Sequence, residues 1–315
     1  MRGSTRAFVT VEDTGMVAVS DIQVEAEFED LSPKTTVMGM ISLMLRKQPL
    51  GSFGAIIVIA MIFMAVFAEI LTSIDPEDNN LEYMLTAPGE MFFLGTDQFG
   101  RDLLTRIIYG ARTALFVGFT CAIIGSSLGL VLGVASAYFG GMFDLIIQRV
   151  VDVIMAFPLI ILALAVVATL GPGVENVIIA ITIPFIPQCA RVVRSNALAI
   201  REIPYIDAAR ALGFSHMRII MRHMVPNVMA PFLIMLTSFL GQAILLEASL
   251  SYLGMGVQEP TAAWGLMLQG GAEEYAESAP WVAIWPGIAI SLAVFGFNLF
   301  GDAVRDTLDP KLRSQ

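Results

Sequence analysis

The sequence predicts an all-α, polytopic membrane protein with six transmembrane helices. Of its 315 residues, 56 % are hydrophobic and only 15 % are charged, and the mean hydropathy is +0.75. A soluble domain carries more charge. Six segments reach the length of about 20 mostly apolar residues that a spanning helix needs. None of them alternates polar and apolar residues as a spanning β-strand would. The six predicted spans are 50–71, 114–139, 150–170, 174–190, 228–246 and 281–300.

The fourth span and the segment before the first span need separate comment. The fourth span is the weakest, because Glu175, Pro184 and Pro187 interrupt it. Ahead of the first span, the chain is polar, and its first apolar run is long enough to span rather than to be cleaved as a signal peptide. Residues 1–45 include the acidic stretch "VEAEFEDLSPK" and are expected to form a solvated tail, disordered near its start.

Charged residues predict the orientation of the spans. Cytoplasmic loops are enriched in Lys and Arg close to the membrane. Basic residues precede span one, fill the connection between spans four and five, and follow span six, whereas the loop 254–280 has four glutamates and no Lys or Arg. The first outer loop is an exception, with three arginines among seven acidic residues. Both termini are therefore expected in the cytoplasm. The basic residues are Arg46, Lys47, Arg191, Arg194, Arg201, Arg210, Arg218, Arg222, Arg305, Lys311 and Arg313.

Several classes of function are not supported by the residues present. A net charge of −10 argues against nucleic acid as a partner. No lysine follows a glycine, so there is no phosphate-binding loop of the Walker A type. The two histidines, His216 and His223, lie far from Cys121 and Cys189, too few ligands for a metal site. We expect no catalytic, cofactor or metal site, and free thiols at both cysteines.

The connection "DAARALGFSHMRIIMRHMVPN" predicts two short helices joined by a tight turn. Pro204 suits the first position of a helix, and Gly213 can take the left-handed conformation that ends it. Ser215 can cap a second helix, "HMRIIMRHM", which Pro226 is expected to end before span five. A helix too short to stand alone, with small alanines on it, favours docking into a groove of another protein. Alternatively, this is an ordinary loop that obeys the charge rule.

The spacing of this connection resembles the EAA loop of ABC importer permeases. Asp207 and two alanines are followed by three residues and Gly213. Nine further residues lead to a four-residue segment whose last residue is Pro226. Asp replaces the usual Glu, and Val225 stands where Leu is common. The resemblance implies a coupling helix that sits in a cleft of a cytoplasmic ATPase subunit. It assigns to ATPase coupling the residues Asp207, Ala208, Ala209, Arg210, Leu212, Gly213 and Pro226.

Three further stretches are similar to the C-type permease of dipeptide and oligopeptide importers. They are "LGTDQFGRD", "EASLSYLGMGVQEPTAAWG" and "RDTLDPKLR", and the resemblance covers nearly everything from Arg46 onwards. It implies a type I permease fold in a prokaryotic inner membrane. The implied partners are a homologous B-type permease, two ATPase subunits that bind ATP and magnesium, an extracytoplasmic binding protein and a peptide. The outer-loop motif contributes Gly95, Thr96, Asp97, Gly100, Arg101 and Asp102.

The chain is divided accordingly into four regions. Residues 1–45 form the tail, and 46–112 hold the first span and an outer loop. Residues 113–304 are the core with five spans and the EAA loop at about 195–226, and 305–315 form a C-terminal tail. In the outer loop, "RDLLTRIIYGAR" is expected to lie flat at the membrane surface as an amphipathic helix, with Asp102 and Arg106 paired at i,i+4. It would either brace this subunit or meet the binding protein.

Two features inside the spans leave alternatives open. Glu247 follows a long apolar run, and it either makes a structural hydrogen bond near the outer surface or lines the translocation path. A small-residue stripe on span two favours close helix packing, with a hinge for alternating access as the alternative. The stripe consists of Gly118, Gly125, Gly129 and Gly133.

The predicted function is that of a non-catalytic permease subunit that forms half of a peptide pathway. The same family also carries nickel complexes, glutathione and some oligosaccharides, and the sequence does not separate these substrates. A secondary transporter would show inverted repeats and several deep ionisable residues, for which Asp152 and Glu247 are thin support. A membrane-embedded enzyme would need a His, Cys or Ser-Lys constellation at membrane depth, and none is evident.

Overall fold

The computed structural model describes residues 49–308, apart from the side chains of Glu273 and Leu308. The predicted tail 1–45, the basic pair Arg46 and Lys47, and residues 309–315 lie outside this range. Regular structure within 49–308 is helical. The elements are α2 (Pro49–Val66), α3 (Ala68–Leu71), η1 (Leu81–Tyr83), α4 (Leu103–Phe139), α5 (Gly141–Met155), α6 (Leu159–Leu170), α7 (Val174–Arg201), α8 (Pro204–Ala211), α9 (His216–Ile219), η2 (Ile220–Met224), η3 (Val225–Val228), α10 (Met229–Tyr252), α11 (Trp264–Glu274) and α12 (Trp281–Leu308).

Five of the described helical segments are long and apolar enough to cross a membrane, and a bent pair makes a sixth if it counts as one span. The pair is α5 and α6, which meet at an angle of 89°. The predicted span over 150–170 therefore corresponds to the end of α5, a break and α6, and it is not one continuous helix. Pro158 lies at the break, where a proline has no N–H for the helix ladder and disfavours the helical conformation at Phe157 before it.

The helices α4 and α7 make the most extensive contact of the bundle. Three glycines of the predicted stripe, Gly125, Gly129 and Gly133, form this contact: an added Cβ would lie 2.7 Å from the Phe185 Cβ at Gly125 and 2.5 Å from the Cys189 Cβ at Gly129, whereas Gly118 faces Ile244 on α10. Close packing is thus confirmed as its structural role. Pro184 and Pro187 were expected to interrupt the fourth span. They lie inside α7, which runs unbroken to Arg201.

The prediction of a separate, flat amphipathic helix at residues 101–112 is wrong. Those residues open α4, which continues as one helix of 37 residues to Phe139. The expected pairing of Asp102 with Arg106 is also not formed. Asp102 instead caps α4, its carboxylate accepting a hydrogen bond from the Thr105 backbone N–H at 2.8 Å.

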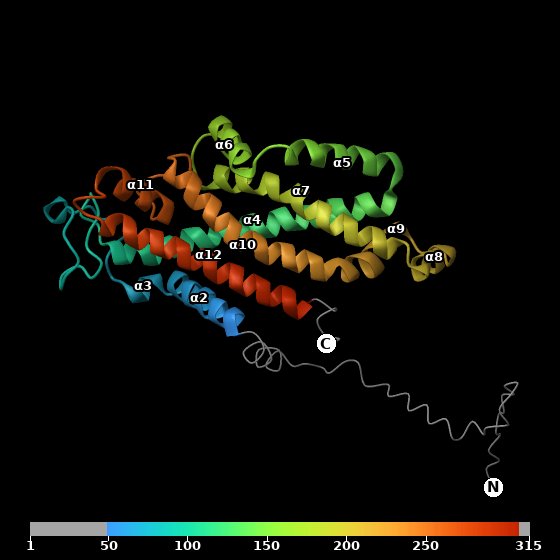
Figure 1. The fold of residues 1–315 in the computed structure, drawn as a ribbon, viewed down its shortest axis with the longest axis horizontal. Helices are drawn as coiled ribbons and strands as arrows, with labels where there is room; N and C mark the ends of the chain where they lie inside the picture. Colours follow the sequence, from blue (N-terminus) through green and yellow to red (C-terminus); the bar gives the residue numbers. More distant parts are fainter. Residues whose placement is uncertain (1–48, 309–315) are drawn as a thin grey trace, which may run out of the picture. The chain divides into compact units, whose positions relative to one another are not determined.

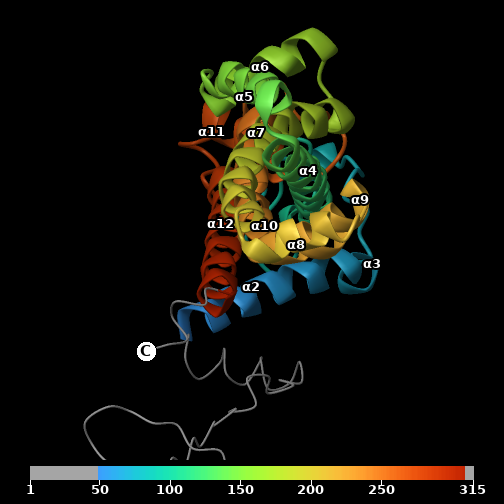
Figure 2. The same ribbon diagram turned by 90° about the vertical axis from the view of Figure 1, so that its right-hand side faces the viewer.

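The remaining spans surround this pair. Helix α12 packs against both α2 and α10, and α2 crosses α12 where Gly54 and Gly296 leave no room for a side chain. Figures 1 and 2 show α2 and the α5–α6 pair on opposite sides of the group formed by α4, α7, α10 and α12. In Figure 1, α8 and the turn between α4 and α5 lie at one end of the helices, and α11 with the loop before α4 lies at the other.

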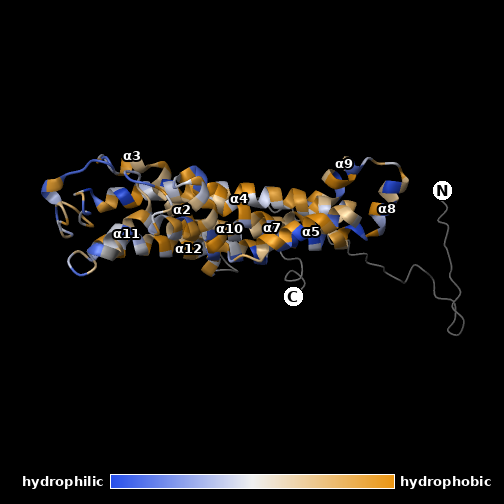
Figure 3. Ribbon diagram, turned by 90° about the horizontal axis from the view of Figure 1, so that it is seen from above, coloured by the Kyte–Doolittle hydropathy of each residue, from blue (hydrophilic) through white to orange (hydrophobic). Residues whose placement is uncertain are grey.

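Polar residues gather at these two ends. In Figure 3 the hydrophobic colour dominates the middle of the long helices, whereas hydrophilic residues concentrate in the loop before α4 and around α8. This is the distribution expected of helices that cross a bilayer. The two polar ends are therefore the parts of the subunit that can contact water-soluble partners.

Candidate functional site

Helix α8 and the turn after it have the geometry that the sequence predicted. Pro204 is its first residue, and Asp207 lies in its first turn. Gly213 has φ +75°. The Gly213 N–H donates to the Arg210 carbonyl at 2.9 Å and the Phe214 N–H donates to the Ala209 carbonyl at 3.1 Å. These two bonds make a Schellman motif, which fixes the direction in which the chain leaves α8.

Aromatic and histidine side chains fasten this segment to the rest of the subunit. Tyr138, at the end of α4, hydrogen-bonds through its hydroxyl to His216 Nδ1 at 2.7 Å. The Asn227 amide donates to the Tyr205 hydroxyl at 3.1 Å, and the Phe214 ring stacks on His223. Both histidines therefore act as structural anchors here. Sequence reasoning missed Tyr138 and Tyr205, although two histidines in one short connection were a signal that it held packed partners.

The predicted coupling residues separate into an exposed and an inward-facing group. Asp207, Ala208 and Leu212 are exposed, the last of them 74 % accessible. Ala209 is buried against the subunit, together with Ile206. The Arg210 guanidinium turns back, donating to the Asp207 carboxylate at 3.1 Å and lying 5.4 Å from the centre of the Tyr138 ring. Of the seven predicted coupling residues, only Ala209 is buried, and Arg210 stays exposed although its guanidinium turns back toward the subunit.

The prediction that Pro226 ends the second helix is wrong. The chain stays helical from His216 to Tyr252. A five-residue π-helix, η2, comes before the proline, and Pro226 itself stands at the start of the 3₁₀ turn η3. Local widening and tightening of a helix accommodate a residue that lacks an N–H. Pro226 is exposed and lies beside Asn227, which bonds to α8.

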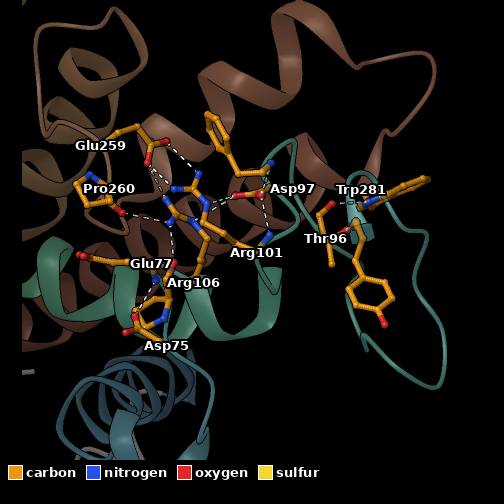
Figure 4. A network of polar contacts seen from close by, with 12 residues as sticks. Asp75, Glu77, Thr96, Asp97, Arg101, Arg106, Glu259, Pro260 and Trp281 are labelled. Atoms are coloured by element: carbon orange, nitrogen blue, oxygen red, sulfur yellow. Dashed lines mark hydrogen bonds and ion pairs between the residues drawn. The ribbon is translucent and has the colours of Figure 1, made fainter. Parts of the chain in front are cut away.

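At the opposite end, the outer-loop motif forms a buried ionic network (Figure 4). The Asp97 carboxylate accepts from the Phe99 N–H at 2.8 Å and from the Arg101 N–H at 3.0 Å, and it pairs with the Arg101 Nε at 2.7 Å. The same guanidinium reaches Glu259, with Nη1 to Oε2 at 2.6 Å and Nη2 to Oε1 at 3.1 Å. The motif is therefore joined to the loop after α10.

A second arginine completes this network. Arg106 is fully buried, and its Nη1 donates to the carbonyls of Pro76 at 2.8 Å and Pro260 at 3.2 Å. It lies 3.7 Å from both Asp97 and Glu259. Two arginines thus face two carboxylates, so the buried charge is balanced. Sequence reasoning did not single out Glu259, because its partners precede it by more than 150 residues.

The electrostatics of Arg101 follow from this balance. Burial by itself lowers the pKa of an arginine, but the hydrogen bond to Glu259 and the charge of Asp97 outweigh it, and the pKa of Arg101 is raised. The guanidinium therefore stays charged at any physiological pH. Arg101 therefore supplies a fixed positive charge between Asp97 and Glu259.

Backbone geometry explains the other residues of the outer-loop motif. Gly95 and Gly100 both have positive φ. Thr96 is buried, donates through its hydroxyl to Tyr83 and accepts from the Thr86 N–H at 2.8 Å. Its carbonyl accepts from the Trp281 indole at 3.3 Å, so the motif also touches the start of α12. These hydrogen bonds hold the loop before α4 against the start of α12.

Glu247 is 1 % exposed and lies near the C-terminal end of α10. The Ser251 hydroxyl donates to its Oε1 at 2.7 Å, and the same hydroxyl oxygen accepts from the Val257 N–H at 3.1 Å. Glu247 thereby ties α10 to the loop that leads to Glu259. Of the two readings that the sequence left open, this geometry favours the structural hydrogen bond.

Comparisons with known proteins agree with this architecture. Residues 125–314 match the family described as "Binding-protein-dependent transport system inner membrane component". Residues 38–88 match the N-terminal transmembrane domain of oligopeptide transport permease C.

Two relatives and one solved structure illustrate the similarity. The chain is 43 % identical over 270 residues to the dipeptide transport system permease protein DppC of Alkalihalophilus pseudofirmus, covering 86 % of this chain and 88 % of that one. It is 41 % identical over 270 residues to the glutathione transport system permease protein GsiD of Escherichia coli, covering 85 % and 88 %. An inward-facing structure of the MetNI methionine ABC transporter shares the fold, with a TM-score of 0.53 at 20 % identity, covering 66 % of this chain and 98 % of that chain.

These matches cover most of the described helices, including the α8 segment and the outer network. The family model spans more than half of the chain, and the curated relatives are similar along nearly their whole length. The chain therefore belongs to the family of binding-protein-dependent transport system inner membrane components, as a permease subunit of an ABC importer.

Proposed function

We propose that this permease subunit forms half of a pathway for peptides and takes up work from a cytoplasmic ATPase through α8. The observation that carries the coupling role is the exposed surface of α8 on a rigid mount. Asp207, Ala208 and Leu212 are exposed, while the Schellman turn and the His216–Tyr138 hydrogen bond connect the segment to the end of α4. A small, rigid helical surface suits a groove on another protein.

The proposed assembly contains a second, homologous permease, two ATPase subunits and an extracytoplasmic binding protein. ATP and magnesium would bind to the ATPase subunits, and this chain would perform no chemical step. The names of the relatives support a peptide substrate: one is a dipeptide permease and another a glutathione permease. Glutathione is itself a small peptide derivative, so it is the second candidate substrate.

Uptake measurements test the substrate. The transporter with its native partner subunits should accumulate a labelled dipeptide in proteoliposomes only when ATP and the binding protein are supplied. Uptake of glutathione in place of the dipeptide would select the second candidate. Uptake of neither would contradict the proposed substrate class.

Two substitutions test the coupling role of α8. Ala208→Trp should overfill the docking groove, and Gly213→Val should strain the left-handed turn by about 1–2 kcal/mol or more. An added Cβ at Gly213 has no neighbour within 4 Å, so the backbone alone carries that effect. Both variants should insert normally, yet lose co-purification with the ATPase or its stimulation by loaded binding protein. Ala208→Ser, which keeps the surface small, is the matched control.

The result that contradicts this role is specific. If both variants retain the ATPase and its transport-coupled activity at wild-type levels, the connection is only a basic loop that follows the charge rule.

The orientation with α8 in the cytoplasm is part of the proposal. It rests on the arginines at and beyond the end of α7, namely Arg201, Arg210, Arg218 and Arg222, and on the acidic loop 254–280. A membrane-impermeant thiol reagent should label cysteines placed in 254–279 from outside, and cysteines placed in 195–222 only after permeabilisation. Labelling of the arginine-rich connection from outside would reverse the orientation.

A further inference from the structure

An ion pair on the α5–α7 surface is half exposed. The Arg191 guanidinium, on α7, contacts the Asp152 carboxylate, on α5. Their side chains remain 47 % and 54 % exposed. Charged side chains inside a membrane are rare, and they face the bundle interior or a water-filled cavity instead of lipid. The surface that carries this pair is therefore a candidate for something other than lipid contact.

Two helices independently place the pair deep along the spans. Arg201, at the end of α7, donates to the Ala137 carbonyl in the last turn of α4 at 2.9 Å, so these two helix ends share one level. Arg191 precedes Arg201 by ten residues, about 15 Å along a helix axis. Asp152 follows the start of α5 at Gly141 by eleven residues, about 16 Å. Half the hydrocarbon thickness is about 15 Å.

Helix α2 shows what a lipid-facing surface of this protein looks like. Its exposed large side chains are apolar throughout, and none carries a charge between Pro49 and Val66. They are Leu50, Phe53, Ile56, Ile59, Ile62, Phe63 and Val66. The α5–α7 surface differs from that of α2 because it exposes two charged side chains, Asp152 and Arg191.

A neighbouring ion pair shows what a structural clamp looks like. Arg194 grips Asp144 with two bonds of 2.6 Å, from Nε and from Nη2. Their side chains are only 27 % and 18 % exposed, and Asp144 is also bonded to Ser136 on α4. The Asp152–Arg191 pair has a single contact, both of its side chains are more exposed than their counterparts in the clamp, and it has no third side-chain partner among the described contacts. Helix α5 is already held in place without it.

The position of Asp152 is unfavourable for the stability of its own helix. It lies in the last turn of α5, and its carbonyl accepts the capping Ala156 N–H at 3.0 Å. A negative side chain at a helix C-terminus opposes the helix dipole. The chain then breaks at Pro158, and broken spans of transporters are where substrate groups are bound.

We propose, on the basis of the permease function proposed above, that Asp152 and Arg191 line the water-filled path and form a subsite for the charged ends of a zwitterionic peptide. The Asp152 carboxylate would accept the peptide ammonium, and the Arg191 guanidinium would bind its carboxylate by paired hydrogen bonds. In the absence of peptide the two groups neutralise each other.

Thiol labelling in the assembled transporter tests the location. Asp152→Cys and Arg191→Cys should react with a charged, membrane-impermeant thiosulfonate in inside-out vesicles. Ile59→Cys, on the apolar surface of α2 and 64 % exposed, should react at least tenfold more slowly. Both native cysteines are buried, so background labelling is low. Labelling at the Ile59 rate would place the pair against lipid, and labelling only without the second permease would place it in a subunit contact. Either result overturns the proposal.

Uptake tests the contact with substrate. Asp152→Asn should lower peptide uptake at least tenfold at unchanged abundance and unchanged ATPase assembly, and Asp152→Glu should restore most of it. Asp144→Asn, which breaks the clamp, should instead deplete the subunit. Wild-type uptake in Asp152→Asn, or loss of uptake together with depletion, would overturn the subsite. If the wild-type transporter imports no peptide, the proposed substrate fails, while the labelling result still decides whether the pair faces water.

Discussion

Gly100 has a backbone conformation and surroundings that only glycine fits. Its φ is +75°, and an added Cβ would lie 1.7 Å from the Asn80 carbonyl oxygen, far inside any non-bonded contact. The same residue donates its N–H to the Asp97 carbonyl at 3.0 Å. This one turn brings Asp97 and Arg101 together, so the ionic network of the outer end depends on it.

We expect Gly100→Ala to unfold the outer loop. The left-handed conformation alone costs about 1–2 kcal/mol for an alanine, and the overlap with Asn80 adds to it. Limited proteolysis of the purified transporter should show faster cleavage within residues 72–102. Gly89→Ala is a matched control in the same loop, because its added Cβ meets nothing closer than 3.9 Å. Equal protection of both variants would show that the loop is held by other contacts.

At the scale of the element, α4 and α7 can approach closely because glycines, which have no side chain, lie at their contact. At Gly129 an added Cβ would meet the Ile186 carbonyl at 2.8 Å as well as the Cys189 Cβ, and at Gly133 it would meet the Ala190 carbonyl at 2.7 Å. Backbone carbonyls do not move aside as a flexible side chain does. The stripe therefore belongs to the interior of this subunit, and it is not a surface kept free for a partner.

Gly129→Leu should separate these two helices and destabilise the subunit by about 3 kcal/mol, as overpacking of a tight contact does. The expected readout is a lower abundance of folded protein in the membrane and a lower midpoint of thermal unfolding. Val131→Leu, on the exposed side of the same helix, should leave both unchanged. If Gly129→Leu accumulates and unfolds as the wild type does, the close contact is not required for folding.

Breaks and continuations of helices were the least predictable features at this scale. Pro158 breaks a span, whereas Pro184 and Pro187 lie inside an unbroken α7, and Pro226 begins a 3₁₀ turn within a continuing helix. A proline removes one hydrogen bond in each case. Whether the chain bends is decided by the neighbouring helices that hold or release it, and local sequence does not contain that information.

At the scale of the whole described part, the outer network ties together three segments that are distant in sequence. Asp97, Arg101 and Arg106 come from the loop before α4 and from its first turns, and Glu259 comes from the loop after α10. Trp281, the first residue of α12, donates its indole N–H to the Thr96 carbonyl in the loop before α4. Movement of one of these segments is thereby coupled to the others. The outer ends of α4, α10 and α12 are expected to move as one unit during transport.

Glu259→Ala should loosen this unit by about 1–3 kcal/mol, toward the lower end because its carboxylate is 39 % exposed. The buried side chains of Arg101 and Arg106 would lose the Glu259 carboxylate and keep only that of Asp97. The thermal midpoint of the purified transporter should fall, and hydrogen exchange should rise together in residues 72–102 and 254–263. Glu277→Ala, an exposed acidic residue of the same side, is the control. An increase confined to one of the two segments would contradict the coupling.

The sequence alone predicted those features that depend on short-range physics. Apolar length predicted the spans, Pro204 and Gly213 predicted the bounds of α8, and the glycine spacing predicted a close helix contact. In each case the cause lies within a few residues: helix capping, a left-handed turn, or one face of one helix. The family followed from the same local motifs.

Only the tertiary structure decided which distant side chains meet. Nothing near Glu259 in the sequence indicates Arg101, and nothing near Asp152 indicates Arg191. It also decided that Ala209 faces inward while Ala208 faces out, and that residues 103–112 continue into a span. The physical reason is that burial and charge pairing are properties of packed neighbours. Helix propensity and hydropathy constrain each segment by itself, whereas the balance of buried charge is set only when the segments come together.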